Sequence, residues 1–336
     1  MRLYGGIDLH SNNAYVVVLD SDGVVRYRRR LANDLGKILS ALERFRCDLA
    51  GIAIESTYNG YWLIDGLQVA GHRVRLANPS AIKQYGKYSA DAEDAEQLAT
   101  LLRLNVLPEG YIYPASDRGI RDLLRKRLRL VQQRTSHILS LETNVARHTG
   151  RHPSWASLRR LGLDAIVGLA PDRWVRESMA TSWATIVFLD DQVHRIQGTV
   201  LRELRPRPAF QALSTVPGIG RVLGPTIVLE SGPIERFAGV GNYSSYCRCV
   251  SSGRYSNGKR KGRGNPKNGN KYLGWAYMEA GQLARRNCDA AARFYERKLK
   301  QTNTVVASKA LAHKLARAGY HVLRDGTPFD PKRCFG

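Results

Sequence analysis

The sequence lacks long hydrophobic runs: among its 336 residues, no stretch approaches the roughly 18 consecutive apolar residues that a membrane-spanning helix needs. We therefore expect no membrane partner. The first residues, Met1-Arg2-Leu3, lead directly into a strand pattern and do not form the charged and apolar regions of a signal peptide. Together these features predict a cytoplasmic protein.

Cysteines are few and irregularly spaced. The chain has 5 of them, an odd number, and contains no Cys-x-x-Cys pair. Neither a disulfide framework nor a zinc knuckle is therefore supported. We expect reduced thiols, as in a reducing cytosol.

Acidic residues are scarce relative to basic ones. The sequence contains 29 Asp and Glu against 52 Lys and Arg, which gives a formal net charge of +23. Such an excess predicts a polyanionic partner, because it attracts phosphate groups over a long range. Nucleic acid is the leading candidate, and a membrane surface, the second, is set aside because the sequence has no membrane-spanning run.

Four of the acids that are present form a pattern. Asp8 lies in an otherwise apolar run and Glu55 ends a second one, whereas Asp91 and Asp94 begin a helical pattern and share its apolar stripe. Burying a carboxylate is costly unless it is paired, and four oxygen donors aimed at one point suit Mg²⁺ or Mn²⁺. Taken singly, each acid has the alternative of a cap or a salt bridge.

The first 115 residues alternate strand and helix patterns. Their order, three strands, helix, strand, helix, strand and helix, is that of the ribonuclease-H-like fold, which carries carboxylates on its first strand, its fourth strand and a late helix. The four acids fall at those positions. We expect strands at residues 3–10, 14–19, 24–31, 49–55 and 74–77, and helices at 33–45, 61–70 and from 91 onward. An α/β domain with a mixed sheet is therefore predicted.

Residues 116–205 have no strand pattern and predict a helical or coiled-coil linker. Amphipathic helices are expected at 116–150 and at about 183–204. The first is dense in basic residues, and Arg125, Lys126 and Arg129 are candidate nucleic-acid contacts. The two helices could pair as an antiparallel arm, form a dimerisation coiled coil, or be a bundle wall with a solvated basic face.

Residues 206–336 follow the break at Arg205-Pro206-Arg207-Pro208 and predict a mainly helical domain. Near its start, the segment 216–220 reads Val-Pro-Gly-Ile-Gly and resembles a helix-hairpin-helix turn. In such a turn Gly218 and Gly220 leave backbone N–H groups open to a phosphate. A plain turn between two helices is the alternative.

The segment 254–271 is strongly basic and contains no acid. Because glycine and asparagine are frequent in it, we expect a flexible loop that becomes ordered on a phosphate backbone. Its bases are candidate nucleic-acid contacts: Arg254, Lys259, Arg260, Lys261, Arg263, Lys267 and Lys271.

These segments together resemble a known family. They are Gly6-Ile7-Asp8, Ile54-Glu55-Ser56-Thr57, Asp91-x-x-Asp94-Ala95, Val216-Pro217-Gly218-Ile219-Gly220, and the segment from Ser256 to Lys267-Asn268-Gly269. In this order they are similar to the insertion-sequence transposases of family one-ten, the bridge-RNA-guided DEDD serine recombinases. The resemblance spans nearly the whole chain, and its specificity lies in the combination.

The resemblance implies a RuvC-like domain with a ribonuclease H fold, a coiled-coil connector and a C-terminal transposase domain. It implies that Asp8, Glu55, Asp91 and Asp94 bind Mg²⁺ or Mn²⁺ and that Ser256 attacks DNA. Ser251 and Ser252 are neighbouring candidates for the nucleophile. A noncoding guide RNA would pair with donor and target DNA. The homo-oligomer would be a dimer of dimers with composite sites, associated with a bacterial or archaeal nucleoid.

Three other functions fit parts of the pattern. A RuvC-like nuclease would use the same acids but water as its nucleophile. A sugar kinase or actin-like ATPase also opens with a Gly-Ile-Asp strand, although the sequence lacks a second Asp-x-Gly-Gly strand and such an enzyme does not need a charge of +23. A noncatalytic RNA-binding protein could have inherited the fold alone.

Overall fold

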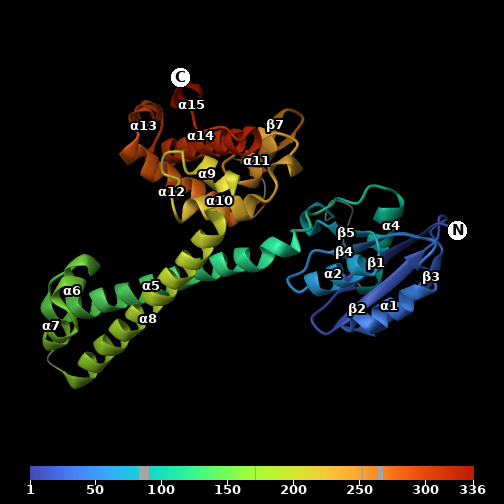
Figure 1. Cartoon of the computed structure of the whole chain (residues 1–336), viewed down its shortest axis with the longest axis horizontal. Helices are drawn as coiled ribbons and strands as arrows, with labels where there is room; N and C mark the ends of the chain where they lie inside the picture. Colours follow the sequence, from blue (N-terminus) through green and yellow to red (C-terminus); the bar gives the residue numbers. More distant parts are fainter. Residues whose placement is uncertain (83–90, 171, 251–252, 264–267) are drawn as a thin grey trace. The chain divides into compact units, whose positions relative to one another are not determined.

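The computed structural model describes residues 1–82, 91–170, 172–250, 253–263 and 268–336 (Figure 1). Contacts divide the chain into two compact units, Met1–Ala115 (unit 1) and Ser116–Gly336 (unit 2). Within the described ranges, no helix has both the length and the apolar character needed to span a membrane.

Unit 1 is built on a mixed sheet of five strands in the order β3-β2-β1-β4-β5. The first three strands are antiparallel neighbours, whereas β1, β4 and β5 run parallel. The strands are β1 (Leu3–Leu9), β2 (Asn13–Leu19), β3 (Val25–Ala32), β4 (Leu49–Glu55) and β5 (Val74–Ala77). The predicted strands and mixed sheet are thus present, with ends shifted by one or two residues.

Helices cover both faces of this sheet. One face packs against α1 (Leu35–Glu43) and α2 (Tyr61–Val69), and the other packs against α4 (Asp91–Arg103). Asp34 caps α1, because its side chain accepts a hydrogen bond from the Lys37 N–H. A short helix, α3 (Pro79–Ile82), follows β5. The sheet therefore forms the middle layer of three.

Unit 2 begins with a pair of long helices, α5 (Ala115–Thr149) and α8 (Arg173–Leu204). They are antiparallel: Arg127 Nη2 donates to Gln197 Oε1 at 2.8 Å, and Arg134 forms an ion pair with Asp190. The short helices α6 (Trp155–Leu161) and α7 (Leu163–Gly168) connect them. Of the three arrangements left open by the sequence, the described chain shows the antiparallel arm.

The second helix of the arm begins well before the predicted residue 183. Its N-cap is Asp172, whose side chain accepts hydrogen bonds from the N–H groups of Trp174 and Val175. In the sequence, this cap follows directly after Ala170-Pro171.

In the part of unit 2 that remains, the described residues are helical apart from one hairpin, β6 (Gly253–Ser256) and β7 (Lys259–Arg263). Helices α12 and α14 pack together at its centre, where the hydroxyls of Tyr243 and Tyr277 lie 2.8 Å apart. The helices are α9 (Pro208–Leu213), α10 (Leu223–Ser231), α11 (Val240–Tyr246), α12 (Lys271–Asn287), α13 (Asp289–Gln301), α14 (Thr304–Asp325) and α15 (Pro331–Phe335).

Candidate active site

Asp8 is a buried carboxylate on the central strand of the sheet. Its residue is 4% exposed, and its Oδ2 lies 3.1 Å from Nε2 of His10, which follows the same strand. A buried carboxylate needs a compensating partner, and His10 supplies one such contact to Asp8. His10 was not predicted to belong to the site, although its i, i+2 spacing from Asp8 was a usable signal.

Glu55 ends the strand next to Asp8. Strands β1 and β4 are parallel, with Gly6 paired to Ala53 and Ile7 paired to Ile54, so Asp8 and Glu55 occupy the next step of the ladder. Neighbouring strands lie about 4.8 Å apart. Side chains alternate between faces, which places Asp8 and Glu55 on the same face as Gly6 and Ala53.

That face is covered by α4, whose first residues are the other two predicted acids. A Cβ on Gly6 would lie 2.0 Å from the Ala95 carbonyl oxygen, so glycine permits the close approach of strand and helix. Asp91 precedes Ala95 by one helical turn, and Asp94 precedes the buried Leu98 by one turn. Asp94 therefore belongs to the sheet-facing side of α4, where the sequence predicts that Asp91 also lies.

The two glutamates near the start of α4 have surroundings different from those of the candidate acids. Glu93 is exposed, and Glu96 forms an ion pair with Arg28 on β3. The sequence analysis did not assign either one to the acid site. The ion pair gives Glu96 a structural partner away from the four candidate acids.

The donor set of this region is suited to a hard divalent cation, because it consists of carboxylate oxygens. The side chain of Asp91 lies outside the described residues. Among the side chains that are described, no three His, Cys, Asp or Glu residues form a group that could hold a metal ion. In the structure, Asp8 and Glu55 share the sheet face that α4 covers. Binding of one metal site by all four acids stays a prediction.

Ser256 lies at the end of β6, paired with Lys259 of β7. Asn257 and Gly258 connect the strands with φ values of 50° and 71°, as a tight type I′ hairpin turn requires. The predicted flexible loop is thus wrong for residues 253–263, which form a hairpin. The Asn-Gly pair was the signal that could have predicted it.

The basic residues of this segment are only partly described. Lys259 and Lys261 are exposed on the hairpin, and Lys271 is exposed at the start of α12. The side chains of Arg254, Ser256, Arg260 and Arg263 are outside the described part of the chain, as are Ser251, Ser252 and Lys267.

The two glycines of the predicted helix-hairpin-helix turn lie between α9 and α10 and differ in their surroundings. Gly218 has φ +82°, and a Cβ there would lie 2.2 Å from the Ala280 carbonyl oxygen of α12. Gly220 is exposed and has no heavy atom within 4 Å of the position of a Cβ. Gly218 is therefore required by packing, whereas Gly220 leaves its backbone accessible.

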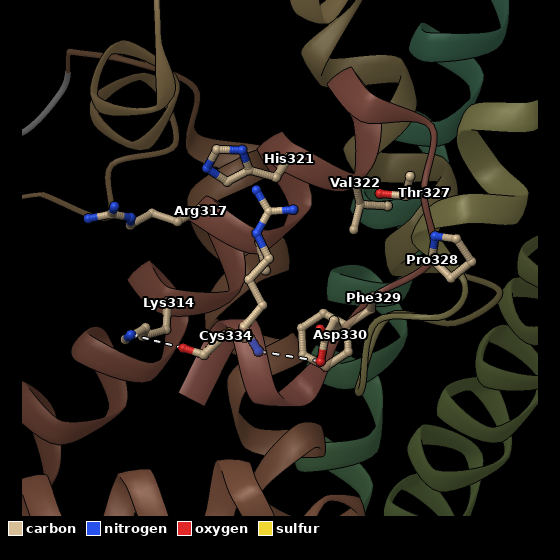
Figure 2. A pocket seen from close by; sticks show the side chains of 11 residues that line it. Lys314, Arg317, His321, Val322, Thr327, Pro328, Phe329, Asp330 and Cys334 are labelled. Carbon is tan, nitrogen blue, oxygen red and sulfur yellow. Dashed lines mark hydrogen bonds between the residues drawn. The ribbon is translucent and has the colours of Figure 1, made fainter. Parts of the chain in front are cut away.

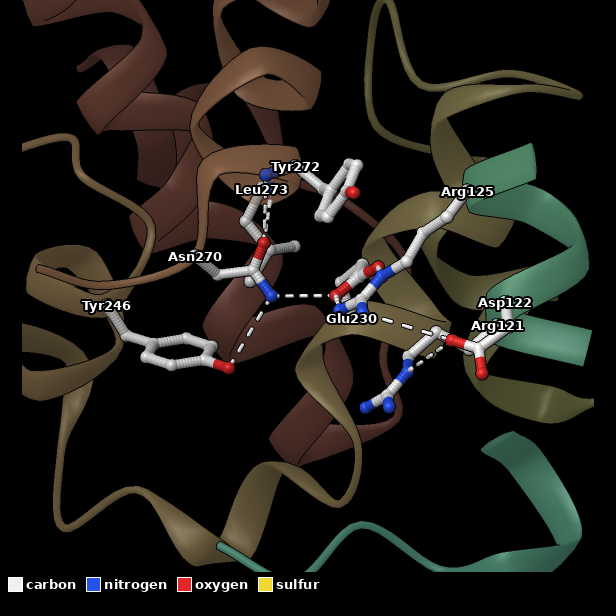
Figure 3. A network of polar contacts seen from close by, with 8 residues as sticks. All are labelled: Arg121, Asp122, Arg125, Glu230, Tyr246, Asn270, Tyr272 and Leu273. Carbon is white, nitrogen blue, oxygen red and sulfur yellow. Dashed lines mark hydrogen bonds and ion pairs between the residues drawn. The ribbon is translucent and has the colours of Figure 1, made fainter. Parts of the chain in front are cut away.

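Arg125 has a partner inside the protein. Its Nε and Nη2 donate to Oε1 and Oε2 of Glu230 at 2.6 and 2.8 Å, and its guanidinium lies over the ring of Tyr272 (Figure 3). Burial lowers the pKa of Arg125, but the hydrogen bonds and charge of Glu230 outweigh it and raise the pKa overall. Lys126 and Arg129, the other two candidates on α5, are exposed.

Glu230 also holds the start of α12. It is 3% exposed and accepts a 2.7 Å hydrogen bond from Asn270 Nδ2, while Asn270 Oδ1 caps α12 by accepting from the N–H groups of Tyr272 and Leu273 (Figure 3). The basic segment therefore ends at a fixed point. The sequence analysis missed this network because its members are far apart along the chain.

Comparisons with known proteins identify related sequences. Residues 5–148 match a DEDD transposase family model of the IS110 type, and residues 210–296 match the model described as "Transposase IS116/IS110/IS902 family". The transposase for insertion sequence element IS1328 of Yersinia enterocolitica is 22% identical over 339 residues, which cover 96% of this chain and 97% of the relative.

The putative transposase y4qE of Sinorhizobium fredii (strain NBRC 101917 / NGR234) is 24% identical over 302 residues, covering 84% of this chain and 73% of the relative. The two family models together span more than half of the chain. The first covers the candidate acids and most of α5, and the second covers the hairpin with Ser256. The protein therefore belongs to the IS110 family of insertion-sequence transposases.

Proposed function

We propose that this transposase moves its insertion sequence by cutting and rejoining DNA strands, with Asp8, Glu55, Asp91 and Asp94 as metal-binding acids and Ser256 as the nucleophile. The observation that carries the proposal is the position of Asp8 and Glu55 on one sheet face, beneath the helix that begins with the two aspartates. The strand order β3-β2-β1-β4-β5 supports a RuvC-like, ribonuclease H type of domain.

The four acids would hold Mg²⁺ or Mn²⁺, which when bound polarises the scissile phosphate and stabilises the leaving oxygen. Because strands and a helix carry these residues, the carboxylates would need little reorganisation to bind the ion. His10 Nε2, which lies 3.1 Å from Asp8 Oδ2, would help to orient that carboxylate. This division of roles assigns the acids to positioning and charge stabilisation.

Ser256 would perform the covalent step. Its hydroxyl loses a proton as Oγ bonds to phosphorus, and the bond from phosphorus to the leaving sugar oxygen breaks, with that oxygen taking up a proton. The resulting phosphoserine link keeps the phosphodiester energy for rejoining, when a DNA hydroxyl attacks and releases the serine. Lys259, the cross-strand partner of Ser256, is a cation on the same hairpin that can offset charge on the phosphate.

A denaturing gel tests the nucleophile. Wild-type protein incubated with labelled element-end DNA and Mg²⁺ should give a DNA-shifted protein band. The band should disappear in Ser256→Ala and persist in Ser251→Ala and Ser252→Ala, which remove the neighbouring hydroxyls. Strand cleavage that continues in Ser256→Ala without a shifted band would show water as the nucleophile, as in a RuvC-like nuclease.

We extend the proposal to a guide RNA that pairs with donor and target DNA and to a dimer of dimers. The net charge of +23 supports an extensive nucleic-acid partner. Purified protein should carry a discrete RNA, and ribonuclease treatment should abolish recombination that added RNA restores. Full activity after complete removal of RNA would contradict RNA guidance while leaving the serine chemistry intact.

A further inference from the structure

A cavity of about 250 Å³ lies between α14 and the last residues of the chain, within unit 2 (Figure 2). One wall is α14, where Lys314, Arg317 and His321 follow at three- and four-residue spacing and so share a helix face. The facing wall is the segment 327–330 together with α15, which contributes Arg333. Side chains from two elements therefore bring basic groups to one hollow.

The described acids do not neutralise these cations. Among the described residues, Arg317 and Arg333 have no acidic group within 4.0 Å. Asp330 lines the cavity, but its Oδ1 accepts the backbone N–H groups of Lys332 and Arg333. Asp325 accepts from Arg324 Nε at 2.9 Å. The cavity consequently keeps an excess of positive charge.

The other polar groups leave hydrogen-bonding capacity. Lys314 Nζ donates to the Cys334 carbonyl oxygen at 2.9 Å, which uses one of its three N–H groups. His321 Nδ1 is buried without a hydrogen-bond partner among the described residues, and Asp325 Oδ2 lies 4.0 Å from it. Burial, followed by the charge of Arg324, lowers the pKa of His321, and Arg333 and Arg317 act in the same direction against Asp325. The cavity therefore retains N–H groups that can donate to a ligand with several oxygens.

We propose that this cavity binds a phosphate group of the DNA that the transposase handles, with Arg317 and Arg333 as its main contacts. A phosphate presents several oxygens at once, and the planar guanidinium matches it with paired N–H groups. Val322, Pro328 and Phe329 supply an apolar wall for the attached sugar. The inference rests on the DNA substrate of the family and does not depend on the identity of the nucleophile.

Fluorescence anisotropy with a labelled single-stranded DNA and the full chain tests this site. The variants are Arg317→Gln, Arg333→Gln and their combination. Arg293→Gln is the matched control, because Arg293 is exposed on α13, lies outside this cavity and carries the same charge. We expect the double variant to raise Kd at least about tenfold and to reduce the salt slope by about one to two, against less than about twofold for the control. An unchanged melting temperature checks the fold.

Strands with a 5′-phosphate and with a 5′-hydroxyl distinguish the source of the phosphate. If the double variant binds both strands equally more weakly, the cavity binds an internal phosphodiester. If it binds only the 5′-phosphorylated strand more weakly, the cavity binds a chain end. Both results support the proposal. Equal losses in the double variant and the control, or no loss, would overturn it. Inorganic phosphate that shifts the His321 imidazole resonance, with unchanged DNA affinity in the double variant, would instead indicate a free-anion site and also overturn it.

Discussion

Arg125 and Glu230 are joined by two hydrogen bonds, of 2.6 and 2.8 Å, although 105 residues separate them along the chain. The pair fixes α5 to α10. Removing one partner of a buried pair costs about 3–5 kcal/mol. Since the Arg125 side chain is 33% exposed, we expect Arg125→Ala to lower the free energy of unfolding of unit 2 by a smaller amount, about 2 kcal/mol in urea denaturation.

The control for Arg125 is Arg129→Ala, which removes an exposed basic residue from the same helix. Its effect should stay within about 0.5 kcal/mol, as for an ordinary surface substitution. Similar losses in both variants would mean that α5 responds to lost helix charge and not to the broken ion pair.

Gly218 and Gly220 should respond differently to alanine. In Gly218→Ala, the new Cβ meets the Ala280 carbonyl oxygen and the residue keeps a positive φ, so we expect unit 2 to lose at least about 2 kcal/mol of stability. Gly220→Ala meets no neighbour and should change stability by less than about 1 kcal/mol. Thermal unfolding of both variants provides the comparison, and equal stability would contradict the packing role of Gly218.

Gly220→Ala also tests phosphate binding by the turn. If its exposed backbone contacts DNA, the added methyl should weaken DNA affinity several-fold while the melting temperature holds. Affinity equal to that of the wild type would exclude a close backbone contact at Gly220.

Asp8→Asn should abolish strand cleavage but preserve the fold. The substitution keeps the shape of the side chain and removes the charge that a cation and His10 would meet. Cleavage of labelled DNA and circular dichroism are the measurements. Glu93→Gln, an exposed acid near the start of α4, is the control and should retain activity. Unfolding of Asp8→Asn would instead indicate that Asp8 is chiefly a structural salt-bridge partner.

Asp20 predicts a pH dependence of unit 1. The Val24 N–H holds the pKa of this buried carboxyl below its ordinary value of 3.8; burial opposes the shift, and Arg26 and the Asp22 N–H add to it. Since the folded pKa is depressed, the stabilisation is present above the unfolded pKa and is lost as pH falls through the folded one. Melting temperatures should therefore fall steadily below about pH 4.

Compared with the wild type, Asp20→Asn should have a lower melting temperature at neutral pH, and its melting temperature should fall less when the pH is lowered. Asp22→Asn, at an exposed position in the same turn, should follow the wild-type curve. An acid response of Asp20→Asn as steep as that of the wild type would assign the effect to other carboxylates.

Local signals were sufficient for most of unit 1. Asp34 marks the start of α1, and the apolar runs around Asp8 and Glu55 fix β1 and β4. The shared face of the two acids follows from parallel pairing and the alternation of side chains, which the sequence order already implied. The contact of His10 with Asp8 depends on side-chain orientation, so it was missed.

Unit 2 was harder to predict because its organising contacts are long-range. Asn270 caps its own helix, a local feature, but its bond to Glu230 crosses 40 residues. The hairpin at Asn257-Gly258 was local and was overlooked, since the density of lysine, arginine and glycine favoured a flexible loop. The role of Ser256 depends on which groups surround its hydroxyl in the folded protein, and the residues next to it in the sequence do not determine those groups.

The arm formed by α5 and α8 has two separate apolar clusters. One joins its base to α9 and α10 through Leu204, Phe210 and Leu229, and the other surrounds Leu141 and Leu158 near α6 and α7. On α5, Arg134, which forms an ion pair with Asp190 of α8, lies between the two clusters. Heptads added to or removed from both helices near this ion pair would therefore change the length of the arm and leave the two apolar clusters in place. The length of the arm can therefore change in evolution separately from the segments at its two ends.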